Sequence, residues 1–295
     1  MHSSEGSVDG QVDVPGASLR YRLAGVKSDL PTLVFENGWS ASYHYWTWVQ
    51  RELAPHAQLL FYNRAGIGGS TLTSPRTAAS LSDQLEAMLV ALNIRQPVVL
   101  VGQSYGGLMC ALHAAQKPQR VRAFVQVDGT PDRDHPYVRK VLGVTKVVTR
   151  IIGVMTRLGL PDPIYGAAAK TLPGDEGEVM LRTSFGSPES MRHAFTELDQ
   201  IDEFRAAIAR ATSMPPRLVI TAGKASEPKG LLGRILASPK KARRVMEIME
   251  EAHREQAAKN GRWMSLPHTH GGLVFEPAGA KATSAATLEF VRSLR

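Results

Sequence analysis

Residues 98–107, VVLVGQSYGG, decide the fold of this chain. An apolar run of strand length leads into a Gly-x-Ser-x-Gly pentapeptide formed around Gly102, Ser104 and Gly106, and a helical-looking stretch follows at 108–117. A strand, a tight turn and a helix in this order predict a nucleophile elbow, in which the serine is strained at the tip of the turn with its hydroxyl exposed. The alternative is a glycine-rich turn that carries a solvated serine.

The residues around the serine fit the first interpretation. We expect glycine at 102 and 106 because a Cβ at either position would collide with the neighbouring strand or helix. The turn also places Ser104 beside the N-terminus of the next helix, whose free N–H groups favour developing negative charge. The pentapeptide in this context therefore predicts a nucleophilic serine.

Composition limits the class of protein. The 295 residues are enough for one α/β domain with an insertion or for two small domains. Cys110 is the only cysteine, so no internal disulfide is possible, and we expect a cytoplasmic location and a small core residue at this position. The first six residues are polar without an apolar signal core, and no run approaches the length of a membrane span.

The positive charge raises the question of an anionic partner. The net charge is +8, but the basic residues are scattered, with one cluster at 240–244. None of the motifs that identify a nucleic-acid module is visible. We therefore expect a basic, solvated surface and no nucleic-acid partner.

Strand-like and helix-like segments alternate along most of the chain. This alternation predicts a mostly parallel, doubly wound sheet with helices on both faces. The alternation of strand and helix stops at residues 130–214, which hold helical stretches but no buried strand, and it resumes after residue 214. The expected strands are 11–14 and 18–23 (a hairpin), 31–35, 58–62, 98–101, 121–128, 217–223 and 262–266; the expected helices include 43–53, 80–92, 240–259 and 278–294.

Several motifs together resemble the α/β-hydrolase fold family. Asn37-Gly38-Trp39 stands where the family has His-Gly-x after its third strand, and residues 63–70, NRAGIGGS, stand where the family often has Asp-x-Arg-Gly-x-Gly-x-Ser. Residues 102–106 match the elbow, and His270 stands seven residues before Pro277, as the family's histidine often does. The resemblance covers nearly the whole chain.

The family's architecture implies a division of the chain. Residues 1–129 and 215–295 would form the α/β-hydrolase core. Residues 130–214 would form a helical lid inserted between the sixth and seventh expected strands.

A serine hydroxyl needs a base within hydrogen-bond reach. In this family the order along the chain is serine, acid, histidine, so the base is expected last. The loop 267–272, PHTHGG, supplies two candidates. We favour His270, from its spacing to Pro277 and the glycines that follow it, and keep His268 as the alternative base. Neither histidine would have a partner if the loop were merely a surface loop.

The acid holds the imidazole in the correct tautomer. The family commonly has an aspartate about three residues after the strand at 217–223, where this chain has Glu227 instead. Asp128, 24 residues after Ser104, stands at the end of the preceding strand, where some dehalogenases and lactonases of the family carry the acid. We therefore favour Asp128 and keep Glu227 as the alternative acid. Asp132 and Asp134 are the remaining candidates for the acid.

The oxyanion of the tetrahedral intermediate needs two hydrogen-bond donors. The resemblance assigns them to the backbone N–H groups of Trp39 and Tyr105, in the loop after the third strand and directly after the nucleophile. No metal site is expected, because the two histidines of the loop lack a third ligand at a recognisable spacing. No cofactor is expected either.

Residues 136–158 are the most informative part of the expected lid. Basic residues form one narrow stripe of the helical wheel, and apolar residues cover nearly everything else. Such a helix packs deeply between the core and other lid helices, contacts a second copy in a homodimer, or roofs an apolar substrate pocket; peripheral membrane association is a further possibility. We expect a small, neutral, largely apolar ester or lactone as substrate.

The sequence thus predicts a serine hydrolase that cleaves a carboxylic ester or lactone through an acyl-enzyme. Serine at 104 disfavours the dehalogenase and epoxide-hydrolase branches of the family, which use aspartate there. Two alternatives stay open. One is a carbon–carbon bond hydrolase that uses the same three residues, and the other is a non-catalytic small-ligand receptor on this fold.

Overall fold

A computed structural model describes residues 6–133, 165–225 and 239–294. The expected helix at 136–158, Asp134 and Glu227 lie outside these residues. Within the described segments, no helix combines the length and apolarity that crossing a membrane requires. Cys110 is fully buried, which confirms the prediction that it is a core residue.

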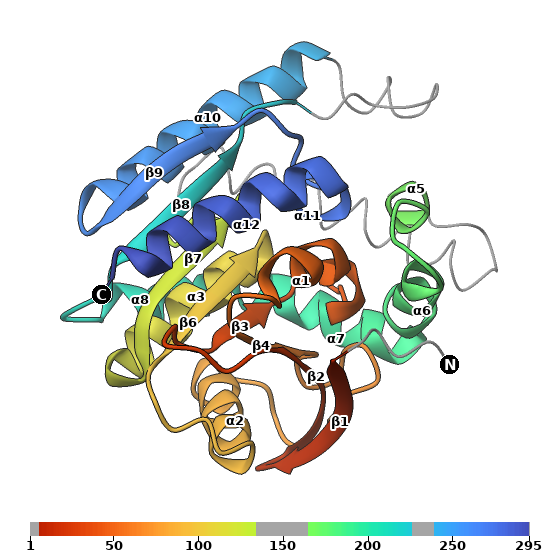
Figure 1. Cartoon of the computed structure of the whole chain (residues 1–295). Coiled ribbons are helices and arrows are strands. Elements are labelled where there is room, and N and C mark those ends of the chain that lie inside the picture. The colour runs from red at the N-terminus through yellow and green to blue at the C-terminus, as the bar shows by residue number, and fades with distance from the viewer. Residues whose placement is uncertain (1–5, 134–164, 226–238, 295) are drawn as a thin grey trace.

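One mixed sheet forms the centre of the molecule (Figure 1). In the described part of the chain its order is β1-β2-β4-β3-β6-β7-β8-β9, with β5 paired to β2. β1 and β2 pair antiparallel, as does β2 with β4, and every later neighbour is parallel. The strands are β1 Ser7–Val14, β2 Ala17–Gly25, β3 Leu33–Glu36, β4 Gln58–Tyr62, β5 Thr71–Leu72, β6 Val98–Gln103, β7 Val121–Val127, β8 Arg217–Ala222 and β9 Gly261–Leu266.

Helices cover both faces of this sheet, because alternate residues of a strand point to opposite faces. Leu33 and Phe35 of β3 pack into one apolar cluster with η1, α1, α11 and α12, whereas Val34 packs into a second cluster with α2, α3 and α8. The helices of the core are η1 Tyr43–Trp46, α1 Thr47–Leu53, α2 Ala78–Ala91, α3 Tyr105–Gln116, η2 Pro118–Arg120, α10 Pro239–Ala258, α11 Gly272–Phe275 and α12 Pro277–Arg292. The prediction of a doubly wound, mostly parallel sheet is confirmed.

Local differences from the predicted elements have physical reasons. The expected helix at 43–53 divides into the 3₁₀ turn η1 and α1. The expected final helix at 278–294 is α12, which begins at Pro277, and a short helix, α11, precedes it where a loop was expected; extended Glu276 separates the two. The two-residue strand β5 is too short to leave a periodic pattern, so no strand was expected at 71–72.

The segment between β7 and β8 is helical where the structure describes it. It contains α5 Tyr165–Ala169, α6 Glu176–Thr183, α7 Pro188–Asp199 and α8 Ile201–Ala209. Leu198, Ile201 and Phe204 join the apolar cluster of α2 and α3. Part of the insertion therefore packs on the core, and its function as a lid stays a prediction.

Candidate active site

Ser104 occupies a sharp turn between β6 and α3. Its φ is 55° and its ψ is −122°, in a region that residues with a side chain seldom adopt. A Cβ at Gly102 would lie 2.2 Å from the Gly106 carbonyl oxygen, and one at Gly106 would lie 2.1 Å from the Glu36 carbonyl oxygen. The close approach predicted for both glycines is confirmed, and it allows the strained elbow to form.

Asp128 follows the last residue of β7, the strand beside β6. Its φ is 46°, and its backbone N–H donates to the Ile220 carbonyl of β8 at 2.6 Å. One carboxylate oxygen, Oδ1, accepts a hydrogen bond from the Ala222 N–H at 3.0 Å. These contacts with β8 fix a buried carboxylate at the edge of the sheet from which Ser104 also projects.

His270 lies against this carboxylate. Its Nδ1 is 2.6 Å from Asp128 Oδ2, and its loop is tied to the end of β8 by hydrogen bonds from the Gly223 N–H to the Leu266 carbonyl and from the Lys224 N–H to the His268 carbonyl. An ionised carboxylate can only accept, so Nδ1 carries the proton and Nε2 keeps its lone pair. This is the tautomer that a general base requires.

Electrostatics within the pair favour the charged state of both groups. Burial alone would raise the pKa of Asp128, but the hydrogen bond and charge of His270, with the nearby His253 and the Ala222 N–H, hold that pKa below its usual range. Burial would lower the pKa of His270, but the hydrogen bond to Asp128 and its charge raise it above the ordinary value of 6.5.

The other ring nitrogen of His270 contacts Gln103, which the sequence reasoning did not single out. The Gln103 side-chain Nε2 lies 3.0 Å from His270 Nε2 and 3.4 Å from the His270 carbonyl oxygen. In this structure Nε2 therefore accepts from Gln103 rather than from the Ser104 hydroxyl. Gln103 precedes Ser104 directly, so the imidazole stands beside the elbow with the lone pair of its Nε2 held by the neighbouring amide.

His253 of α10 was also missed. It is fully buried, its Nε2 donates to the Gly129 carbonyl at 2.7 Å, and its Nδ1 is 2.9 Å from Thr221 Oγ1. Its Nδ1 also lies 3.8 Å from Asp128 Oδ1. Nothing local distinguishes His253 from a surface histidine, because its partners come from β8 and from the turn after β7.

The two expected oxyanion donors flank the elbow. Tyr105 is the first residue of α3, so its N–H has no partner within the helix. Trp39 lies in the loop after β3, where a Cβ at Gly38 would lie 2.8 Å from the side-chain oxygen of Gln103. The Trp39 indole N–H donates to the Ala194 carbonyl of α7 at 2.6 Å, which ties this loop to the insertion.

Two further candidates, Asp132 and His268, make contacts outside the Asp128–His270 pair. Asp132 is paired with Arg217 at 2.6 Å, which indicates a structural role. His268 is partly buried and contributes backbone hydrogen bonds to the loop. His113 is buried between Ser82 Oγ and the Glu36 carboxylate, as a packing residue of α3. Across the described segments, no group of three His, Cys, Asp or Glu side chains is arranged to hold a metal ion.

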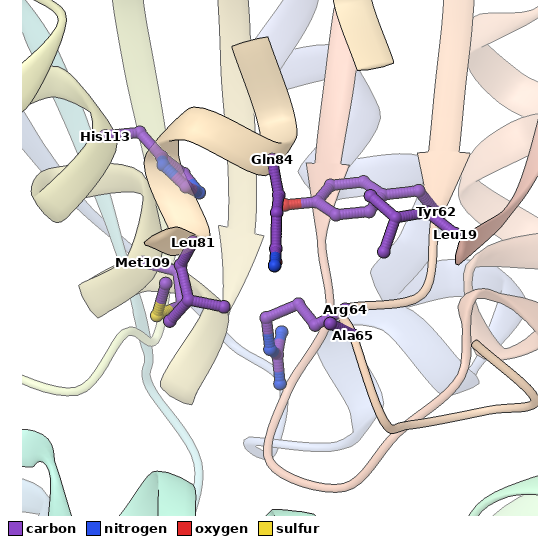
Figure 2. A pocket seen from close by; sticks show the side chains of 8 residues that line it. All are labelled: Leu19, Tyr62, Arg64, Ala65, Leu81, Gln84, Met109 and His113. Atoms are coloured by element: carbon purple, nitrogen blue, oxygen red, sulfur yellow. The ribbon is translucent and has the colours of Figure 1, made fainter. Parts of the chain in front are cut away.

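A small cavity lies on the α2 and α3 side of the sheet (Figure 2). Its volume of about 10 Å³ is room for about one water molecule. The side chains around it are Leu19, Tyr62, Arg64, Ala65, Leu81, Gln84, Met109 and His113. Neither Ser104 nor His270 lines this cavity, and it is too small for an ester substrate.

Known proteins share this fold. A family model described as "alpha/beta hydrolase fold" matches residues 31–145. A Gibberella zeae protein described as an AB hydrolase superfamily protein is 31% identical over 110 residues, covering 36% of this chain and 34% of that protein. A pimeloyl-[acyl-carrier protein] methyl ester esterase of Yersinia enterocolitica is 32% identical over 99 residues, covering 34% and 36%.

The matched part of this chain spans about a third of the length of each of these two relatives, 34% and 36%. A Hormonema carpetanum protein described as the transporter efuK is 31% identical, and the match covers 20% of its length. Among solved structures, a mutant of a Pseudomonas aeruginosa protein described as an epoxide hydrolase superposes with a TM-score of 0.73. That alignment covers 99% of both chains at 18% sequence identity, so it establishes the fold alone.

Proposed function

Since the chain belongs to the α/β-hydrolase fold family, we propose that it is a serine hydrolase that cleaves a largely apolar carboxylic ester or lactone through an acyl-enzyme. Ser104 is the nucleophile, His270 the general base and Asp128 the acid that orients the base. The Trp39 and Tyr105 N–H groups stabilise the oxyanion. The esterase relative supports hydrolysis of an ester without identifying this chain's substrate.

One observation carries the proposal: the Asp128 carboxylate lies 2.6 Å from His270 Nδ1, beside the strained elbow that carries Ser104. The carboxylate fixes the tautomer in which Nε2 is free to take a proton. Two neighbouring parallel strands, β6 and β7, end at these residues, as is usual for catalytic groups in open α/β sheets.

The reaction follows from these positions. His270 Nε2 exchanges its hydrogen bond with Gln103 for one with the Ser104 hydroxyl and takes the proton as Oγ attacks the ester carbonyl carbon. The carbonyl oxygen becomes an oxyanion, which the two backbone N–H groups bind. The imidazolium then protonates the leaving alcohol, the acyl-enzyme forms, and a water molecule activated by the same imidazole releases the acid.

The surroundings of Trp39 favour an apolar substrate. Phe185 and Phe195, both from the insertion, lie with ring centroids 6.4 Å and 5.9 Å from that of Trp39. This aromatic group stands next to an expected oxyanion donor, where an acyl or alcohol chain would pass. Burial of apolar substrate surface there would contribute about 25 cal/mol per Å².

Labelling of the serine tests the proposal. The full-length protein is incubated with a fluorophosphonate and compared with Ser104→Ala, and a panel of p-nitrophenyl esters, lactones and apolar diketones is assayed with both. We expect labelling and ester turnover that depend on Ser104. Diketone cleavage without ester cleavage would favour the carbon–carbon bond hydrolase. Absence of both labelling and turnover would favour a non-catalytic receptor.

A further inference from the structure

We propose that Arg64 is a positioning residue of the oxyanion hole: it orients and polarises the Trp39 N–H, and Glu197 of α7 holds its guanidinium in place. The inference rests on the proposed function, since it concerns how that site stabilises negative charge. It assigns a role in the reaction to a helix of the insertion, which reaches the oxyanion loop through one buried ion pair.

Arg64 reaches the loop after β3 with two nitrogens. Its Nη1 donates to the Asn37 carbonyl at 2.6 Å, and its Nη2 donates to the Gly38 carbonyl at 3.1 Å. Only 2% of its surface is exposed, so these hydrogen bonds form away from bulk water. Hydrogen bonds from a charged donor are stronger than neutral ones, and in a buried site they are little screened.

The Gly38 carbonyl and the Trp39 N–H belong to one peptide group. This group is planar and trans, so a donor that fixes the direction of the carbonyl also fixes the direction of the N–H. The Ala41 N–H donates to the same carbonyl at 3.2 Å, which leaves that oxygen with two donors. A cation on the carbonyl also polarises the peptide and strengthens its N–H as a donor.

The second oxyanion peptide is held in a similar way without a side chain. The Ser104 carbonyl, which shares a peptide with the Tyr105 N–H, accepts from the Gly107 N–H at 3.0 Å and the Thr130 N–H at 2.8 Å. Arg64 contacts this side too, because its guanidinium carbon lies 5.0 Å from the centre of the Tyr105 ring. One side chain thus contacts the peptide group of the first expected donor and the ring of the residue that supplies the second.

Glu197 fixes the guanidinium from the opposite side. Arg64 Nε donates to Glu197 Oε1 at 2.6 Å, and Arg64 Nη2 donates to Oε2 at 3.0 Å. This forked pair restrains the plane of the guanidinium as well as its position. Glu197 is fully buried, and its backbone carbonyl accepts from the Tyr105 hydroxyl at 3.3 Å.

A second buried arginine provides an internal control. Arg76 Nη1 donates to the same Glu197 Oε1 at 3.1 Å, but Arg76 Nη2 donates to the Ala65 carbonyl. Arg76 therefore shares the carboxylate and the burial of Arg64, while its hydrogen bonds in the described structure reach neither the Asn37 nor the Gly38 carbonyl. A change at Arg76 reports the cost of disturbing Glu197 without the direct contact with the oxyanion loop.

The test compares Arg64→Lys with Arg76→Lys in the full-length protein. Lysine keeps the charge but cannot donate in the fixed fork of arginine. The readout is kcat and KM for a p-nitrophenyl ester and for the thionoester with the same groups, together with thermal unfolding. Sulfur accepts hydrogen bonds poorly, so the ester-to-thionoester ratio of kcat reports how strongly the hole binds the oxyanion.

We expect Arg64→Lys to lower kcat for the ester about tenfold or more, with little change in KM and a smaller ester-to-thionoester ratio. Arg76→Lys lowers the unfolding temperature but leaves that ratio at the wild-type value. Glu197→Gln, which keeps the shape of the side chain, lowers the ratio less than Arg64→Lys. It serves as the deciding variant if Arg64→Lys does not fold.

Three results would overturn the inference. One is a folded Arg64→Lys protein, or a folded Glu197→Gln protein in its place, with the wild-type ratio. Another is the same change of ratio in Arg76→Lys as in Arg64→Lys, which would show a general effect of the buried ion pairs. A wild-type protein that neither labels with fluorophosphonate nor turns over any ester overturns the proposed function, and the inference with it.

Discussion

Asp128 Oδ2 lies 2.6 Å from His270 Nδ1, although 142 residues separate the two along the chain. The contact forms because β7 ends beside the end of β8, to which the loop of His270 is tied by backbone hydrogen bonds. The remaining carboxylate oxygen is held by the Ala222 N–H of β8. The carboxylate is therefore oriented before any substrate binds.

Replacement of Ser104 by alanine is expected to remove ester turnover, because the other hydroxyl of the elbow, that of Tyr105, is buried and donates to the Glu197 carbonyl. The fold should persist, since the serine side chain is only partly buried and no side-chain hydrogen bond caps α3. Turnover of p-nitrophenyl esters and the circular dichroism spectrum check both parts. Retained turnover would exclude Ser104 as the nucleophile.

Asp128→Asn is expected to lower kcat roughly 10³- to 10⁴-fold, because an amide favours the wrong tautomer of the imidazole. Glu227→Gln is the matched control, since Glu227 is the alternative acid and the same isosteric change is made. We expect nearly wild-type kcat for that variant. A larger loss in Glu227→Gln than in Asp128→Asn would assign the acid to Glu227.

The activity should fall in acid. Asp128 and its hydrogen bond raise the pKa of His270 above 6.5, and the imidazole must be neutral to act as a base. The half-maximal point of the acid limb in kcat/KM is therefore expected above pH 6.5. The lowered pKa of Asp128 keeps the carboxylate ionised throughout this range, so a single limb is expected. A rate that does not change across neutral pH would contradict a histidine base.

Gln103→Leu should move this limb to higher pH. The amide of Gln103 donates to the lone pair of His270 Nε2 at 3.0 Å, which stabilises the neutral ring and lowers its pKa. Removal of the amide takes away one of the two influences on the pKa of His270 that oppose Asp128, and burial remains. The measurement is kcat/KM against pH beside the wild type, and a shift of the limb to lower pH would contradict this assignment.

His253→Phe should destabilise the protein by about 1–3 kcal/mol for each buried partner left without a hydrogen bond. The Gly129 carbonyl, 2.7 Å from His253 Nε2, loses its donor, whereas the Thr221 hydroxyl, 2.9 Å from His253 Nδ1, keeps the hydrogen bond that it accepts from Trp263 Nε1. Because the Gly129 carbonyl follows Asp128 directly, kcat should also decrease while KM changes little. Urea unfolding and steady-state kinetics measure the two effects. Unchanged stability would show that α10 does not support the turn after β7.

Local patterns in the sequence predicted most of the architecture. The apolar run at 98–101 and the glycines around Ser104 predicted both the strand β6 and the elbow, because strand propensity and a tight turn depend on nearby residues. The repeated alternation of strand and helix predicted the parallel sheet. The two-residue strand β5 was not predicted, since it forms through pairing with β2 rather than through the pattern of its own residues.

Within the candidate site, the sequence supplied the residues but not their partners. It named Ser104, His270 and Asp128, yet it left His268, Glu227 and Asp132 open beside them. Tertiary structure paired Asp132 with Arg217 and placed Asp128 against His270. The roles of Gln103 and His253 became visible only there.

By itself the sequence determined a doubly wound sheet with Ser104 on a sharp turn, because periodicity and turn chemistry act over a few residues. Only the tertiary structure decided which carboxylate meets the imidazole and that Arg64 joins the loop after β3 to Glu197. Arg64 and Glu197 are 133 residues apart along the chain. Hydrogen bonds and ion pairs between such distant, buried groups depend on how strands and helices pack, and no local pattern records that packing.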